Sequence, residues 1–127
     1  ADSSILDVYL TTIPGFESCS DTFSLQIKFF DGSIGSIHYF SNGSNSFPKE
    51  RLEVFVSGNV FCLDNYRKLK AWGVPGFVTK RSFSQDKGQF NCAQAFLNAL
   101  DSKKGQPPIP VEQLFEVQAW LNKVLKK

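Results

Sequence analysis

Several things are missing from this sequence, beginning with methionine, and histidine occurs only once. Its apolar runs are far shorter than the roughly 20 residues that a membrane-spanning helix needs. The first residues, 1–11, lack the basic stretch and apolar core of a secretory signal. We therefore expect a cytoplasmic protein with no membrane partner. The absence of methionine and the start at Ala1 lead us to expect a processed product or a piece of a longer chain.

An excess of charge of one sign is also missing. Fourteen Lys and Arg face twelve Asp and Glu, which gives a net charge of +2. The densest basic cluster, Arg67, Lys68 and Lys70, alternates with Leu69 as one solvated face of a strand would. Binding to nucleic acid needs a concentrated basic patch with aromatic rings placed to stack on bases. We expect no nucleic-acid partner.

Patterned cysteines and nucleotide-binding glycines are absent as well. Cys19, Cys62 and Cys92 are odd in number and form no CxxC pair, which argues against a disulfide framework and against a zinc site. We expect reduced thiols and no metal. No GxGxxG follows a predicted strand, and no GxxxxGK[ST] occurs. The chain by itself is therefore expected to bind neither NAD nor NADP.

The composition that remains is typical of a globular domain. The 127 residues are 42% hydrophobic and 14% aromatic, and a chain of this length buries roughly two-thirds of its unfolded surface. We expect one domain over 1–127, strand-rich over 1–84 and helical over 85–127. Strands that precede helices, rather than alternate with them, predict an α+β fold. It would have a mainly antiparallel sheet with two C-terminal helices packed on one face.

Alternation of apolar and polar residues predicts the strands. It is clearest over 23–30, where Phe23 and Leu25 alternate with polar neighbours. Turn pairs at 31–32, 42–43 and 58–59 favour tight antiparallel connections, so we expect a meander of consecutive strands. The predicted strands cover 5–12, 23–30, 34–40, 51–56 and 60–63, with a further ribbon at 67–72 and 76–81.

Helical spacing replaces this alternation after residue 85. Apolar residues recur at i, i+3, i+4 and i+7 from Ala93 to Leu100, and a second stripe runs from Leu114 to Leu125. These stripes predict helices over 87–100 and 111–125. The proline-rich segment 107–110 separates them.

His38 is the only residue that could supply imidazole chemistry. On a strand it shares a face with Ile34, Ser36 and Phe40. No GxSxG motif accompanies the nearby serines. We prefer the simpler interpretation, a histidine on a partly covered sheet face, to a catalytic one.

Charges of both signs accompany the strand predicted at 51–56. Lys49, Arg51 and Glu53 would project to one face, opposite Leu52 and Val54. One interpretation is a solvated or edge-protecting face. The other is a polar face lining a cleft that another domain closes, and composition does not separate the two.

Several segments resemble, in the same order, the C-terminal domain of the oxidoreductase family of glucose-fructose oxidoreductase and inositol dehydrogenase. They are most similar to the branch in which this module follows a zinc-type, alcohol-dehydrogenase-like domain in one chain. The likeness spans about 21–125. It is carried by DGSIG at 31–35, by Ile37, Tyr39, Asn42 and Gly43, by FPKERLEVF at 47–55, by QDKG at 85–88, and by PPIP at 107–110 with Glu112.

The resemblance implies a large, mainly antiparallel sheet in a longer protein, whose separate Rossmann domain binds NAD or NADP and carries a lysine-bearing motif. The substrate, a sugar, polyol or related alcohol, would lie between that domain and the sheet. Many relatives use an Asp and His pair that has no counterpart in residues 1–23, so no catalytic residue carries over, and this chain alone is expected to be inactive. The candidates for contacts in the substrate pocket are His38, Tyr39, Lys49 and Arg51.

Two functions remain open at this point. The first is the substrate-side and oligomerisation domain of an NAD(P)-dependent oxidoreductase, whose partner is its own missing N-terminal domain. The alternative is a free-standing α+β binding module that holds a protein or a small apolar ligand on its open sheet face. Both sheet faces carry apolar residues, and helices shield only one of them. We therefore expect a homo-oligomer that buries the other face, with Tyr39 or Phe55 at its centre.

Overall fold

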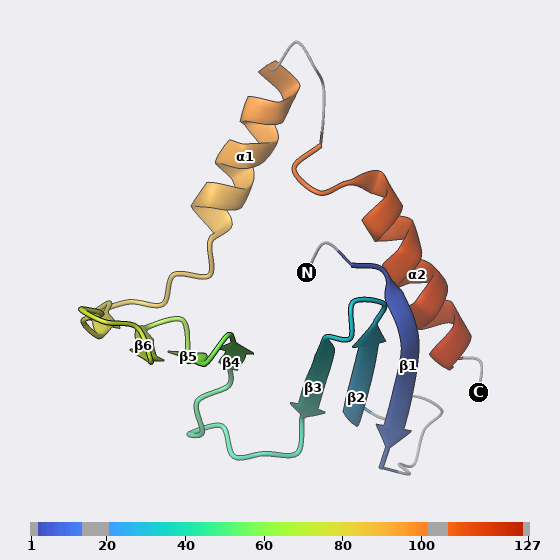
Figure 1. The fold of residues 1–127 in the computed structure, drawn as a ribbon, viewed down its shortest axis with the longest axis horizontal. Coiled ribbons are helices and arrows are strands. Elements are labelled where there is room, and N and C mark those ends of the chain that lie inside the picture. Colours follow the sequence, from blue (N-terminus) through green and yellow to red (C-terminus); the bar gives the residue numbers. More distant parts are fainter. Residues whose placement is uncertain (1–2, 14–20, 102–106, 126–127) are drawn as a thin grey trace. The chain divides into compact units, whose positions relative to one another are not determined.

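The computed structural model describes residues 3–13, 21–101 and 107–125. The chain divides into two units, Ala1–Gly43 with Asn98–Lys127 (the first unit) and Ser44–Leu97 (the second unit). The α+β fold class is confirmed, with antiparallel strands followed by two helices. The elements in chain order are β1 (Ile5–Thr12), β2 (Thr22–Phe29), β3 (Ile34–Phe40), β4 (Arg51–Val56), β5 (Asn59–Asp64), β6 (Lys68–Trp72), β7 (Lys80–Arg81), α1 (Gln89–Asp101) and α2 (Val111–Leu125) (Figure 1).

The first unit contains a three-stranded antiparallel sheet in the order β1-β2-β3. Leu25 lies opposite Leu10 on one side and Ile37 on the other, so these three side chains share one apolar face. On the opposite face Ser24 lies opposite His38, and β3 adds the apolar side chains of Ile34 and Phe40 to it. The alternation in β2 thus produces one apolar and one polar face, as the sequence predicts.

Helix α2 packs against β1 in this unit (Figure 1). The Glu116 carboxylate accepts a hydrogen bond from the Ile5 N–H at 2.7 Å. Val117 of α2 and Phe29, which belongs to the apolar face, line the same small cavity of about 210 Å³. We conclude that α2 covers part of the apolar face, which agrees with the half-buried state of Trp120.

The second unit contains a four-stranded antiparallel sheet in the order β4-β5-β6-β7. Cys62 lies between Glu53 and Lys70 in the register, so charged side chains flank this thiol on one face. Cys62 is only 3% exposed. The other face is apolar and pairs Val54 with Phe61.

The predicted boundaries of β1, β3, β4 and α2 match the structure, and β7 is shorter than expected. The predicted meander is interrupted, because β3 and β4 belong to different sheets. The turn pair at 42–43 does not close a hairpin; a ten-residue segment, 41–50, connects the two strands and includes Pro48, which cannot donate to a strand ladder. Within the second unit, α1 packs on none of β4 to β7. The single domain over 1–127 stays a prediction.

Candidate functional site

A solvent-open groove of about 440 Å³ lies within the second unit. Three separate segments line it: residues 45–50 before β4, Asn65 in the β5–β6 hairpin, and Gln85 with Lys87 before α1. Its volume falls within the range of small-molecule sites. Two of these segments, 47–50 and 85–87, belong to the family resemblance, and the fold brings them together.

A tight hairpin turn supports the groove. Asn65 and Tyr66 both have positive φ, 50° and 52°, and the Arg67 N–H donates to the Asp64 carbonyl at 2.9 Å. These are the features of a type I′ turn over 64–67, within a three-residue connection between Asp64 and Lys68; the second central position of such a turn normally favours glycine. A tyrosine there costs roughly 1 to 2 kcal/mol of backbone strain. Residues in such sparsely populated conformations cluster at functional sites.

Hydrogen bonds fasten the flanking segments to this turn. The Asn65 N–H donates to the Glu50 carbonyl at 2.6 Å. The Gln85 amide donates to Asn65 Oδ1 at 2.5 Å, and the Asp86 N–H donates to the Tyr66 carbonyl at 3.3 Å. The turn therefore fixes the position of both segments that carry the groove's charged side chains.

The groove's charged groups are two ammonium groups and one carboxylate, from Lys49, Lys87 and Glu50. Lys87 Nζ lies 5.9 Å from the centroid of the Tyr66 ring, at the limit of a cation–π contact. Among the described residues, the ion pairs all involve Arg51. Neither lysine of the groove is thus neutralised by a carboxylate of the described chain.

The remaining lining suits a ligand rich in hydroxyl groups. The side chains of Asn45, Ser46, Asn65 and Gln85 offer amide and hydroxyl donors and acceptors. Phe47 is 73% exposed beside them and presents an apolar ring. These groups can bind and orient a ligand through hydrogen bonds and through packing on the ring.

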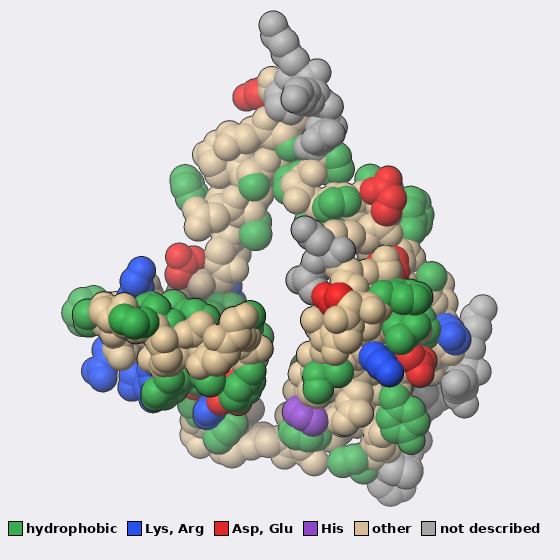
Figure 2. Space-filling view, viewed as in Figure 1, with side chains coloured by type: hydrophobic (Ala, Val, Ile, Leu, Met, Phe, Trp, Pro, Cys, Tyr) green, Lys and Arg blue, Asp and Glu red, His purple; other side chains and the backbone are tan. Residues whose placement is uncertain are grey.

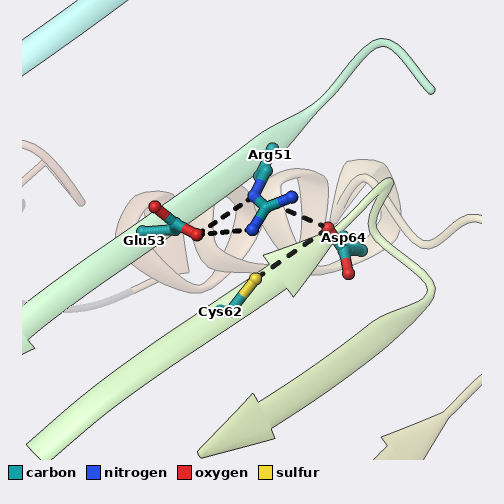
Figure 3. A network of polar contacts seen from close by, with 4 residues as sticks. All are labelled: Arg51, Glu53, Cys62 and Asp64. Carbon is teal, nitrogen blue, oxygen red and sulfur yellow. Dashed lines mark hydrogen bonds and ion pairs between the residues drawn. The ribbon is translucent and has the colours of Figure 1, made fainter. Parts of the chain in front are cut away.

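Arg51 lies outside this groove, in a network on the charged sheet face (Figure 3). Its Nη2 and Nε atoms lie 2.6 and 3.1 Å from Glu53 Oε1, and Nε lies 4.0 Å from Asp64 Oδ1. The hydrogen bond that Arg51 donates to Glu53, together with the negative charge of Glu53, raises the pKa of Arg51, with smaller contributions from Cys62 and Asp64. Cys62 Sγ donates a weak hydrogen bond to Asp64 over 3.9 Å. The sheet's own carboxylates therefore engage this guanidinium.

His38 and Tyr39 belong to the first unit. His38, the purple side chain in Figure 2, is exposed; its Nδ1 lies 2.8 Å from Ser24 Oγ, and its ring stacks on Phe40 at 5.8 Å. Tyr39 stacks on Phe23 at 5.5 Å between ring centroids. The simpler interpretation of His38 stays a prediction.

Of the four predicted pocket residues, only Lys49 lines the groove. The sequence interpretation did not single out Asn65, Gln85 and Lys87 as site residues. Gln85 and Lys87 stood within the family resemblance. Asn65 could have been found from the turn at 64–67, because asparagine tolerates positive φ.

The described residues contain neither a metal-binding cluster nor a membrane-spanning helix. Within 3–13, 21–101 and 107–125, no three His, Cys, Asp or Glu side chains gather as a metal site requires. No helix in those ranges combines the length and apolar character needed to cross a membrane.

A solved structure resembles this fold over nearly the whole chain. It is UDP-N-acetylglucosamine 3-dehydrogenase GnnA from Acidithiobacillus ferrooxidans, with a TM-score of 0.66 and 15% sequence identity. This chain shares its fold with part of that dehydrogenase. The alignment covers 98% of this chain but only 44% of the dehydrogenase chain. No protein-family model matches the sequence, and no curated protein sequence matches it significantly.

Proposed function

We propose that this chain is the substrate-side and oligomerisation domain of an NAD(P)-dependent oxidoreductase that acts on a sugar, a polyol or a related alcohol. The supporting observation is the extent of the structural likeness. This chain matches a dehydrogenase almost from end to end, yet spans less than half of that enzyme's length. The family resemblance of the sequence points to the same kind of module.

The cofactor belongs to another part of the proposed enzyme. A dinucleotide cradle requires a glycine-rich turn that leads directly from a strand into a helix. In the described chain, α1 follows the irregular segment 82–88, whose only glycine is Gly88, and α2 follows the prolines of 107–110. The described residues therefore do not fit NAD or NADP.

The groove provides what a substrate-side domain needs. Hydroxyl groups of a sugar form directional hydrogen bonds with amides, and Asn65 and Gln85 are already held in place by their mutual hydrogen bond. Apolar faces of sugar rings pack on aromatic rings such as Phe47. In this proposal the groove binds and orients the substrate, while hydride transfer occurs at the cofactor domain.

The test uses the natural full-length protein that contains this chain. Formation of NADH or NADPH is followed at 340 nm with a panel of sugars, polyols and simple alcohols. We expect turnover of at least one sugar or polyol, and a raised KM for Gln85→Ala, because this change removes a hydrogen-bonding group of the groove. Lys80→Ala, in β7 and outside the groove, is the matched control and should leave KM unchanged. Absence of turnover across the panel with both cofactors would contradict the proposal.

The alternative, a binding module that uses an open sheet face, is favoured by one observation. The apolar face of β4 is exposed, with Leu52 at 57%, Val54 at 43% and Val56 at 50%. Contiguous exposed apolar surface commonly marks an interaction site. If the full-length protein has no dehydrogenase activity and captures a second protein through this face, the alternative replaces the first proposal.

A further inference from the structure

We propose that the groove binds an anionic group, a carboxylate or a phosphate, carried by the sugar or polyol; this inference rests on the proposed function and narrows its substrate class. The sugar hydroxyls would contact the amides, and the anion would lie between Lys49 and Lys87.

The positive charge of the two groove lysines is not neutralised by an ion pair within the described chain. Lys49 and Lys87 come from segments far apart in the sequence, yet line one concave surface. The carboxylates of strands β4 and β5, Glu53 and Asp64, are engaged by Arg51. Glu50 is the only carboxylate in the lining. Within the lining the two lysines outnumber the one carboxylate, and the next carboxylate, that of Asp86, lies outside the lining.

Helix α1 begins two residues after Lys87. Helix α1 has 13 residues and no acidic side chain in its first turn, so only Asp86, which precedes the helix, offsets the partial positive charge of its N-terminus. Asp86 is the nearest acid before the helix, and its Oδ1 accepts a hydrogen bond from the Gly88 N–H at 2.9 Å. An anion near Lys87 is attracted by the N-terminus of the helix as well as by the ammonium group.

The backbone beside each lysine is held in position before any ligand binds. The Asn65 N–H fixes the carbonyl of Glu50, the neighbour of Lys49. The Asp86 N–H, adjacent to Lys87, is fixed by the Tyr66 carbonyl. A site whose backbone is already fixed loses less conformational entropy when it binds a ligand. This arrangement distinguishes the two lysines from isolated surface lysines.

The test measures binding to the natural full-length protein by calorimetry at low salt. The probes are glucose, glucuronate and glucose 6-phosphate, which share a ring and differ in charge; the two anions separate a carboxylate site from a phosphate site. We expect at least one anion to bind ten times more tightly than glucose, and this advantage to shrink as salt increases. The double variant Lys49→Met with Lys87→Met should abolish the advantage.

Matched variants keep the result interpretable. Lys80→Met removes a charge of the same sign outside the groove and should change nothing. Glu50→Gln removes the one competing carboxylate and should tighten anion binding several-fold. Lys87→Arg, which keeps the charge, should retain most of the anion affinity and shows that a loss in the methionine variants does not come from misfolding. Circular dichroism of every variant confirms that the fold is retained.

The outcomes separate this inference from the function on which it rests. Equal affinity for glucose and for both anions, or an anion advantage that survives the double variant, overturns the inference. If the enzyme oxidises a neutral sugar and replacing the two lysines does not change this activity, the anion-site inference is overturned and the proposed function stands. Charge-dependent binding of an anion by a protein without dehydrogenase activity supports the anion site and overturns the proposed function.

Discussion

Glu116 Oε1 accepts a hydrogen bond from the backbone N–H of Ile5 at 2.7 Å, across 111 positions of the sequence. The bond joins α2 to the start of β1, where the register shifts between Ile5 and Asp7. An irregularity of this kind leaves backbone groups outside the regular ladder. The carboxylate thus satisfies a donor at the strand's irregular end and fixes the helix on the sheet.

Replacing Glu116 with Ala should lower the free energy of unfolding by about 1 to 3 kcal/mol, because a partly buried donor loses its charged acceptor. Glu116→Gln retains an oxygen at the same reach and should cost less. Denaturant titration of both variants provides the measurement. Equal stability of Glu116→Ala and the unmodified protein would show that water replaces the carboxylate without loss.

Gly73 lies close to the backbone of Gly58 in the second unit. Its φ is +80°, and a Cβ there would lie 2.7 Å from the Gly58 carbonyl oxygen and 2.9 Å from Asn59 Oδ1. Gly73→Ala therefore combines left-handed strain with a clash against backbone. Gly76 has φ of +75° but nothing within 4 Å of the added atom, so Gly76→Ala costs only the strain, roughly 1 to 2 kcal/mol. Thermal unfolding should rank Gly73→Ala as clearly less stable than Gly76→Ala.

The sequence predicted the strands and helices well wherever the hydrophobic period was regular. β3, β4 and α2 appear with the expected bounds because alternation or a helical stripe defines both their ends. The break between two sheets was not predicted, because the turn signal at 42–43 is the same whether a hairpin or a longer connection follows. Only the loop length before Arg51 distinguishes them.

The site was less predictable than the fold. Lys49 was identified from its place beside a charged strand, but its partners come from a turn and from a segment before a helix. Local periodicity carries no information about which loops meet in space. Arg51 was a reasonable candidate for a substrate contact by residue type. Only the geometry shows that its guanidinium already pairs with Glu53 and Asp64.

The described thiols should differ sharply in reactivity. Cys62 is buried and Cys92 is exposed, and both are free; Cys19, which the sequence predicted to be reduced in a polar loop, lies outside the described residues. In a Cys19→Ser background, an alkylating reagent should modify Cys92 in the native protein and Cys62 only after unfolding. Mass spectrometry without reductant counts the modified sites. A pair that stays unmodified in denaturant would indicate a disulfide.

Lys68 should show the effect of crowded positive charge. Its pKa is lowered from 10.5, chiefly by the charge of Lys70 and then by that of Arg81, which lies directly opposite it in the sheet. The folded state disfavours the charged form of Lys68, so this lysine lowers the stability of the protein at neutral pH. That stability is regained as the pH rises through the lowered pKa and the lysine loses its proton. Lys70→Gln should raise the pKa of Lys68, measured by NMR titration, and should stabilise the protein more at pH 7 than near pH 11. Lys80→Gln removes a charge from the other face and should have a smaller effect.

If the oligomer predicted from the sequence forms, we expect it to use one face of the second sheet. Val54 lies with Leu52 and Val56 on the exposed apolar face, whereas Phe55, 73% exposed, lies with Arg51 and Glu53 on the charged face. Burying apolar side chains is the main driving force for stable association, and charged groups at the centre of an interface oppose it.

We therefore expect the full-length protein to sediment as a homo-oligomer and Val54→Lys to shift it toward the monomer. Phe55→Lys is the paired variant from the opposite face, at the position that the sequence predicted to be central. A larger shift for Phe55→Lys than for Val54→Lys would move the interface to the charged face. Sedimentation of the unmodified protein at monomer mass across micromolar concentrations would remove the assembly role, and the apolar face would then be available for a different partner.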